Sequence, residues 1–309
     1  LGRFYMGHLE GRIADIVLTQ PGLDRALDFH VDGGGRPGGR YVRRRITVTG
    51  KAQQHHHLLN LAAWPDNPIL GRPEHRSAIL SLAYLSLATP GLGGVLAPEA
   101  IRRKHLAEGV GAVGRHLGNI AAGFPEAIRE AYRYLHGRYV AKPRLPGFFI
   151  TNKAQRYAFF YHAEQAPNPE SRVRLNGACD ALGMPRLRID LRYGEIDARS
   201  VVKSHAVIDR FIRENRLGRL DYAVPEGERA ASVLDQATDG YHQIGTTRMA
   251  ADPARGIVDR DLRVHGTPNL FVASSSVFPT SSQANPTLML AAFSARLADH
   301  LSKTLPKLA

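Results

Sequence analysis

The sequence predicts an α+β protein in which an antiparallel sheet packs with helices. Three observations support this fold class: short β-like runs near the N-terminus, amphipathic helical patterns over residues 75–140, and a second group of short strands at 155–193. Turns separate the strands within each group, which favours antiparallel pairing. A chain of 309 residues is long enough for one large domain or two unequal ones.

The first elements mix short strands with glycine. The stretch "DGGGRPGGR" at 32–40 predicts a flexible loop, and "YVRRRITVTG" at 41–50 is a strand candidate. Apolar residues then recur at helical spacing over 75–88, which predicts a helix with one buried face.

Two more helices are expected at 98–123 and 124–140. The second begins with favourable residues, since Pro125 suits the first helical position and Glu126 lies in the first turn. From residue 141 onward the pattern changes, and short strands are expected at 146–152, 155–165 and 171–176.

"PRLRIDLRY" is the cleanest strand pattern in the chain, because apolar residues alternate with charged ones from 185 to 193. An amphipathic helix follows at 197–215, with Asp197 as a plausible N-cap. Its expected buried stripe consists of Val201, Val202, Ile208 and Ile212.

The last part, 236–309, has a different character. A His/Gly/Thr segment precedes an apolar strand candidate, "NLFVASS" at 269–275, and a final helix. Asn285 is a good N-cap for that helix and Pro286 a good first residue.

Composition excludes several classes of protein. No apolar run approaches the ~18 residues of a membrane span. The N-terminal stretch shows no secretory h-region. Because the chain begins with Leu1, we expect a fragment, so targeting stays open, with a cytoplasmic location favoured. Cys179 is the only cysteine, which excludes an internal disulfide and a cysteine metal cluster.

The net charge is 41 − 28 = +13, which fits anionic partners or an arginine-rich solvated surface. We favour the surface and expect no nucleic-acid partner, because the basic residues are scattered and form no stripe with aromatics.

Several motifs are decoys. "GVGAVG" at 109–114 matches G-x-G-x-x-G, but it follows a helical stretch and no βαβ unit surrounds it, so close helix packing or a helix break is favoured. The run His55–His57 fits a partly exposed tract better than a metal site. The group His162, Glu164 and Glu170 could supply a His/Glu metal pair, but a polar strand end and a Pro-rich turn explain it as well. We therefore expect no metal.

Three elements near the C-terminus occur in a specific order. "YHQIGTTRM" at 241–249 precedes "GIVDRDLRVHGTPNLFVASSSVFPT", and "NPT" then opens the last helix. Together they resemble the C-terminal signature of the glucose–methanol–choline (GMC) family of flavin-dependent oxidoreductases. The likeness is specific over residues 236–304 and extends more weakly through "LGRFYMGH" and the β-rich middle.

This resemblance implies an FAD enzyme that takes a hydride from the CH–OH carbon of an alcohol, with a sugar or polyol as a guess at the substrate. It assigns His242 as the catalytic base and Asn285 as its partner. It also places Ser274, Ser275, Pro286 and Thr287 beside the flavin. Alone, a histidine in a Gly/Thr-rich loop is more often structural, and only the joint pattern favours catalysis.

The chemistry agrees. An imidazole, with an unperturbed pKa of about 6.5, suits removal of a hydroxyl proton near neutral pH. An asparagine can hydrogen-bond the same hydroxyl without competing for the proton. A helix N-terminus offers free N–H groups and a positive dipole end to the electron-rich reduced flavin.

The family holds the cofactor phosphates on an N-terminal G-x-G-x-x-G turn, and this chain has no credible one. We therefore expect residues 1–235 to be mostly substrate-binding region and 236–309 to be the C-terminal segment of a Rossmann-like FAD-binding domain. The N-terminal FAD-binding half would then be missing, and the isolated chain would bind FAD poorly and be inactive. Two alternatives remain: a lyase on the same scaffold, and a non-catalytic basic binding protein.

Overall fold

A computed structural model describes residues 1–32, 39–97, 99–106, 111–147, 149–152, 154–238 and 240–304 of the chain. Its centre is a five-stranded sheet with the order β4-β5-β6-β1-β9, and every pairing in it is antiparallel. The strands are β1 (His8–Leu18), β4 (Ile46–Thr47), β5 (Leu61–Asp66), β6 (Arg156–Glu164) and β9 (Gly218–Tyr222). The predicted α+β class with an antiparallel sheet is thus confirmed.

One face of the sheet packs on α8 (Glu195–Glu214) and α9 (Arg229–Asp235). Side chains alternate along a strand, so Leu9 of β1 and Tyr161 of β6 share this buried face. Val201, Ile208 and Ile212 of α8 complete the core, as their spacing predicts. The opposite face carries His8, Glu10 and His162, because Glu10 is the register partner of His162.

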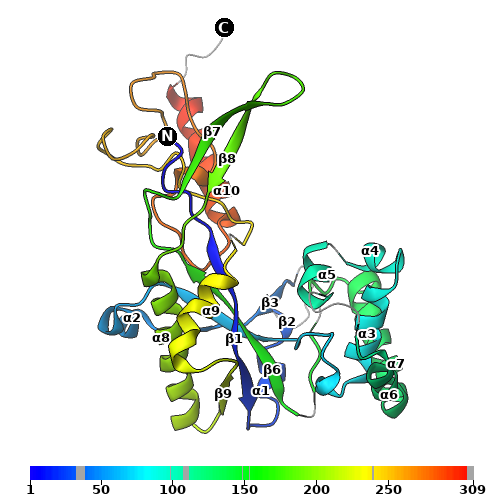
Figure 1. The fold of residues 1–309 in the computed structure, drawn as a ribbon. Helices are drawn as coiled ribbons and strands as arrows, with labels where there is room; N and C mark the ends of the chain where they lie inside the picture. Colours follow the sequence, from blue (N-terminus) through cyan, green and yellow to red (C-terminus); the bar gives the residue numbers. More distant parts are fainter. Residues whose placement is uncertain are drawn as a thin grey trace.

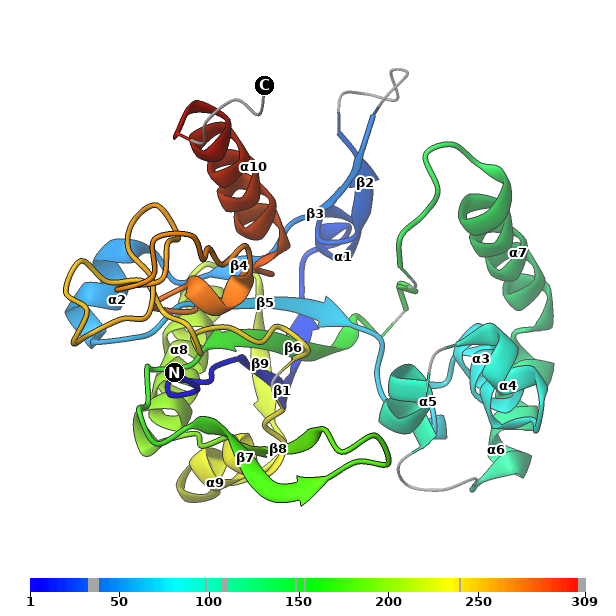
Figure 2. The ribbon, with the colours of Figure 1, turned by 90° about the horizontal axis from the view of Figure 1, so that it is seen from above.

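A separate group of helices is inserted between β5 and β6, and it lies to one side of the sheet in both ribbon views (Figure 1, Figure 2). It comprises the 3-10 turn Pro73–His75, α3 (Ala78–Ala88), α4 (Leu92–Leu96), α5 (Glu99–Leu106), α6 (Val113–Ala122), α7 (Phe124–Leu135) and a π-helical turn, His136–Val140. Leu80 and Tyr84 of α3 are fully buried at its centre. Buried His116 hydrogen-bonds Ser81 Oγ at 3.0 Å, which joins α6 to α3.

The helix predicted at 98–123 is therefore two helices, α5 and α6. The G-x-G-x-x-G decoy falls partly at 109–110, outside the described residues, and its Gly114 lies in the first turn of α6. Gly111 N–H donates to the hydroxyl of Tyr84 at 3.0 Å, so this end of the motif joins the helices.

Other short elements complete the chain. They are α1 (Leu23–Ala26), α2 (Gly50–His56), the hairpin of β2 (Phe29–Val31) and β3 (Tyr41–Arg43), the 3-10 turns Glu226–Glu228 and Ser275–Val277, and α10 (Thr287–Thr304). The loop predicted at 32–40 falls largely outside the described residues. The strand predicted at 41–50 is broken, because β3 and β4 join different sheets. The histidine run ends α2, with His55 and His57 exposed.

β7 (Arg172–Cys179) and β8 (Pro185–Asp190) form a two-stranded ribbon that projects above the main sheet in Figure 1. The strand predicted at 185–193 is present, but its apolar row is not buried. Leu187 is 63% exposed and its register partner Leu175 is 65% exposed. No third strand joins this ribbon among the described residues, so alternation alone could not give the burial.

Three local predictions were wrong. Residues 149–152 are irregular, and 269–275 contributes only a bridge between Arg263 and Phe271. Asp197 is not the N-cap of α8, because the helix begins after Gly194. The Asp197 carboxylate instead accepts the Gly194 N–H at 2.7 Å from the third helical position.

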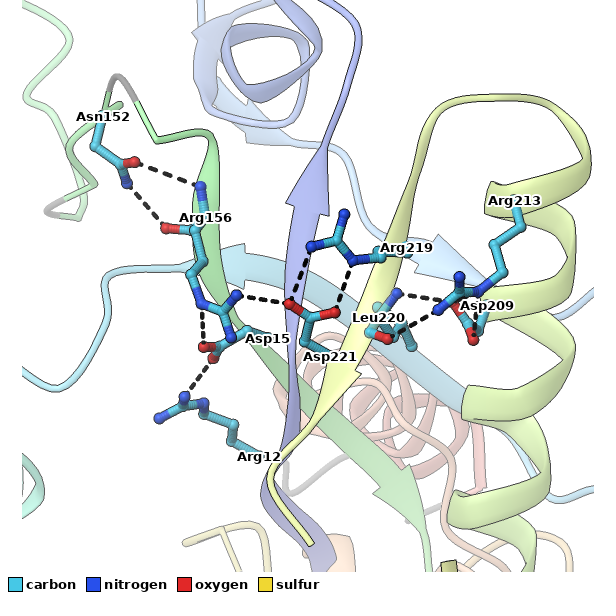
Figure 3. Close-up of polar contacts among 9 residues, drawn as sticks. All are labelled: Arg12, Asp15, Asn152, Arg156, Asp209, Arg213, Arg219, Leu220 and Asp221. Carbon is cyan, nitrogen blue, oxygen red and sulfur yellow. Dashed lines mark hydrogen bonds and ion pairs between the residues drawn. The ribbon is translucent and has the colours of Figure 1, made fainter. Parts of the chain in front are cut away.

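A ladder of ion pairs crosses the sheet from β6 through β1 to β9 (Figure 3). Asp15 and Asp221 are direct register partners. Arg156 contacts both, with Nε 3.0 Å from Asp15 and Nη1 2.6 Å from Asp221. Arg219 Nε lies 2.8 Å from Asp221 on the other side. Like charges placed opposite each other destabilise a sheet, so the arginines offset this repulsion.

Asp221→Asn tests this ladder. Burial alone would raise the pKa of Asp221, but the hydrogen bonds and charges of Arg219 and Arg156 outweigh it and hold the pKa below its usual value. The stabilisation is therefore fully present above the unfolded pKa of about 3.9 and is lost as the pH falls through the lower folded value. We expect a loss of about 1 kcal/mol or less at pH 7.

Thermal midpoints of the variant and the wild type, measured from pH 7 down to strong acid, should converge below about pH 4. The exposed Asp235→Asn is the matched control. A difference that persists unchanged into acid would contradict an electrostatic origin.

Candidate functional site

The C-terminal segment and the first strand line a half-open cavity of about 260 Å³. Its wall includes His242 and Asn285, which are far apart in the sequence. The remaining lining is His8, Ile244, Phe278, Pro279, Thr280, Ser281, Ser282, Ala284, Pro286, Met289 and Phe293. Polar and apolar groups thus meet at one small site.

Backbone pairing to the N-terminus positions His242. Ile244 and Met6 exchange two hydrogen bonds, at 3.0 and 3.1 Å, and Gly2 N–H donates to Thr246 O at 2.9 Å. The glycine of the motif is required here, because Gly245 has φ +96° and a Cβ would lie 2.1 Å from Phe4 O. The histidine segment is therefore held against the residues that lead into β1.

The 3-10 turn Ser275–Val277 holds the other side of the histidine segment. Ser275 Oγ donates to Gln243 O at 2.8 Å, and Met249 N–H donates to Val277 O at 2.7 Å. Ser274 Oγ accepts the Ser276 N–H at 3.2 Å and so caps the turn. Ser274 and Ser275 do not line the cavity, and their role beside a flavin stays a prediction.

Helix α10 begins at the edge of the cavity. Pro286 lines it, and its carbonyl accepts the first helical hydrogen bond, from Leu290 N–H at 2.9 Å. The described helix starts at Thr287, slightly later than an N-cap at Asn285 implies. Thr287 is exposed and lies outside the cavity wall. The backbone N–H groups of this first turn have no partner within the helix.

Histidines from two strands pack behind His242. The ring of His8 lies edge-on to His242, with centroids 4.9 Å apart, and is stacked on His162 at 5.6 Å. His162 Nε2 lies 3.1 Å from a carboxylate oxygen of Glu10. Burial, followed by the charges that His162 and His242 can carry, lowers the pKa of His8 to about 4. His8 is thus a neutral imidazole near pH 7.

Sequence reasoning missed His8 and Glu10. The sequence offered one indication of them: His8 ends "LGRFYMGH", the weaker part of the family resemblance, and Glu10 follows two residues later. The group of His162, Glu164 and Glu170 seen in the sequence does not converge in space. Glu164 accepts two hydrogen bonds from Asn60, and Glu170 pairs with arginines. Within the described ranges no cluster of three His, Cys, Asp or Glu side chains could hold a metal ion.

A larger hollow of about 450 Å³ lies on α5 and is lined by Glu99, Arg102, Arg103 and Leu106. All four of these lining residues belong to one helix, and the part of the chain that the structure describes brings no group from another element to them. It is a less suitable reaction site than the His242 cavity. Of the helices described, none has the length and apolar character to cross a bilayer.

Part of the chain is similar to known proteins. Residues 167–294 match the family model described as GMC oxidoreductase. The chain is 34% identical over 137 residues to the fructose dehydrogenase large subunit of Gluconobacter japonicus, covering 44% of this chain and 23% of that protein. It is 33% identical over 132 residues to paromamine 6'-oxidase of Streptomyces fradiae, covering 43% and 23%.

Among solved structures, formate oxidase of Aspergillus oryzae is similar with a TM-score of 0.44 and 16% identity, over 98% of this chain and 48% of that one. The matched segment spans about a quarter of the length of the curated relatives, 23% in both cases.

Proposed function

We propose, from the premise that this chain carries the C-terminal domain of the GMC oxidoreductases, that it supplies the catalytic base of an FAD-dependent oxidoreductase acting on an alcohol or sugar. Relatives are named for the oxidation of fructose, paromamine and 2-methyl-1,2-propanediol. All three are hydroxyl compounds, which supports a CH–OH donor for this chain as well.

The observation that carries the proposal is that His242 and Asn285 line one cavity. An imidazole nitrogen of His242 takes the hydroxyl proton of the substrate as the carbonyl forms. Asn285 hydrogen-bonds the same hydroxyl and orients it. FAD, when bound beside the cavity, would supply the acceptor for the hydride that leaves the substrate carbon.

The residues at the cavity fit a flavin. The N-terminal turn of α10 presents backbone N–H groups and the positive end of an 18-residue helix at the cavity edge. Phe278, Met289 and Phe293 add apolar surface suited to a planar ring. Pro286 and Thr287 would approach the cofactor through this turn. Ser274 and Ser275 would lie close to it through the backbone.

Anaerobic reduction of the flavin tests this function. The FAD-loaded enzyme that contains this chain is mixed with a sugar, a polyol or a primary alcohol, and the absorbance of oxidised flavin is followed. At least one hydroxyl compound should bleach the flavin, whereas its fully O-methylated ether should not, because that ether has no hydroxyl proton to give. Cyanohydrin cleavage with the flavin unchanged would instead favour a lyase.

A further inference from the structure

We propose that His8 and His162, held by Glu10, form a positioning column behind His242 and fix the orientation of its ring. The inference rests on the proposed role of His242 as base. It adds residues of the central sheet to that site, and these residues lie far from the C-terminal motifs in the sequence.

The column is a continuous ring-to-ring contact. His162 stacks on His8 with an interplanar angle of 18°, and His8 meets His242 at 62°, a T-shaped contact. Trp64 closes the far end, edge-on to His162 at 5.0 Å. His8 is only 2% exposed. A ring that cannot move under these contacts restricts the ring that packs against it.

Glu10 joins the column to the chain segment that leads to His242. One carboxylate oxygen lies 3.1 Å from His162 Nε2, and the other accepts the Thr238 hydroxyl at 3.0 Å. Closer to His242 in the chain, Gly240 packs so tightly that an added Cβ would be 3.3 Å from the Cβ of His8. The sheet and the His242 segment are therefore fitted to each other at two points.

Charge agrees with this role. Glu10 contacts the column at His162, and the Arg45 guanidinium lies over the Trp64 ring at the far end, 4.0 Å from its centroid. Arg12, on the same strand as Glu10, is paired with Asp15. Because His8 stays neutral near pH 7, it places no positive charge beside His242 when His242 takes a proton. His8 thus packs against the base without opposing its protonation.

The test compares His8→Ala with His8→Phe in the FAD-loaded enzyme. Alanine removes the ring that supports His242, and we expect kcat to fall about tenfold to a hundredfold with KM changed by less than about threefold. Phenylalanine keeps an aromatic ring in place and should recover kcat to within about threefold of the wild type. A purely structural role would lower the thermal midpoint without this split between kcat and KM.

A second readout does not depend on turnover. Acylation of His242 by diethyl pyrocarbonate, followed by mass spectrometry, should be several-fold faster in His8→Ala than in the wild type and close to the wild type in His8→Phe. Should His8→Ala fail to fold, His162→Ala gives the same test with a more distant ring, whose centroid lies 6.3 Å from that of His242. We expect a smaller effect in the same direction.

Three outcomes would overturn the column. Wild-type kcat and acylation rates in His8→Ala would mean that His242 needs no support. Equal loss in the Phe and Ala variants would mean that the imidazole nitrogens act on the substrate directly. A fall in kcat matched by an equal rise in KM in His8→Ala would indicate that His8 contributes to substrate binding. If the wild type oxidises no alcohol, the proposed function fails, but the acylation rates still decide the column.

Discussion

His242→Ala should lower kcat/KM for alcohol oxidation by roughly 10²- to 10⁴-fold, the range that a general base contributes. His242 lines the cavity together with Asn285, and no other described histidine except His8 does so. His8 is buried and keeps a low pKa of about 4, so it is a poor substitute base near neutral pH. The loss is measured by steady-state turnover and by anaerobic flavin reduction.

The control for this variant is His55→Ala, which removes an exposed imidazole at the end of α2. It should leave both kinetic constants unchanged. FAD content, from the ratio of flavin to protein absorbance, should be the same in all three enzymes. A His242→Ala enzyme that keeps more than about a tenth of wild-type turnover would contradict a role as general base.

Asn285→Ala should have a smaller effect, about three- to tenfold on kcat/KM, because one neutral hydrogen bond contributes about 0.5–1.5 kcal/mol. The relative size of the losses in kcat/KM of His242→Ala and Asn285→Ala tests the two roles. A larger loss of kcat/KM in Asn285→Ala than in His242→Ala would contradict the assignment of His242 as the base.

The two cavity residues proposed for catalysis could be predicted from the sequence because their motifs are local and ordered. His242 and Asn285 each sit in a short pattern, and the interval between the patterns matches the family. Both residues line one cavity in the structure, and their catalytic roles stay a prediction. Ser274, Ser275 and Thr287 lie outside the cavity wall, and their position beside a flavin stays a prediction. The division of the chain at residue 235 also stays a prediction.

The histidine column could not be predicted in the same way. It depends on the register of β1 against β6, in which Glu10 lies opposite His162. These residues are separated by about half of the chain, and a single sequence does not specify which strands pair. The motif around His8 was visible, but its proximity to His242 follows from long-range pairing.

The wrong strand at 269–275 has a comparable cause. Its apolar character is real, but Val272 N–H donates to Leu262 O and the following turn bonds to residues 247–249. The segment thus takes its hydrogen bonds from loops rather than from a ladder. Periodicity reports which side chains are buried, and it does not identify the backbone partner.

Gly245→Ala should destabilise the protein far more than Asp221→Asn does, and it should also impair catalysis. An alanine at φ +96° is strained by about 1–2 kcal/mol, as for any residue with a Cβ in a left-handed conformation. Its Cβ would also lie 2.1 Å from the carbonyl oxygen of Phe4 and 2.8 Å from the side chain of Met6. Backbone atoms cannot rotate away, so we expect a total loss of about 3 kcal/mol or more.

Gly266→Ala separates the two causes of this loss, the strain of a positive φ and the clash of the added Cβ. Gly266 also has a positive φ, +73°, but nothing lies within 4 Å of its added Cβ. It should therefore cost only the conformational part, about 1–2 kcal/mol, and leave kcat intact. Urea denaturation of both variants measures the difference, and turnover shows whether His242 has moved. Equal losses in the two variants, with full activity in Gly245→Ala, would mean that the histidine segment is not held against Phe4. Unequal losses, with kcat reduced only in Gly245→Ala, would show that close backbone contact at this glycine keeps the base beside its cavity.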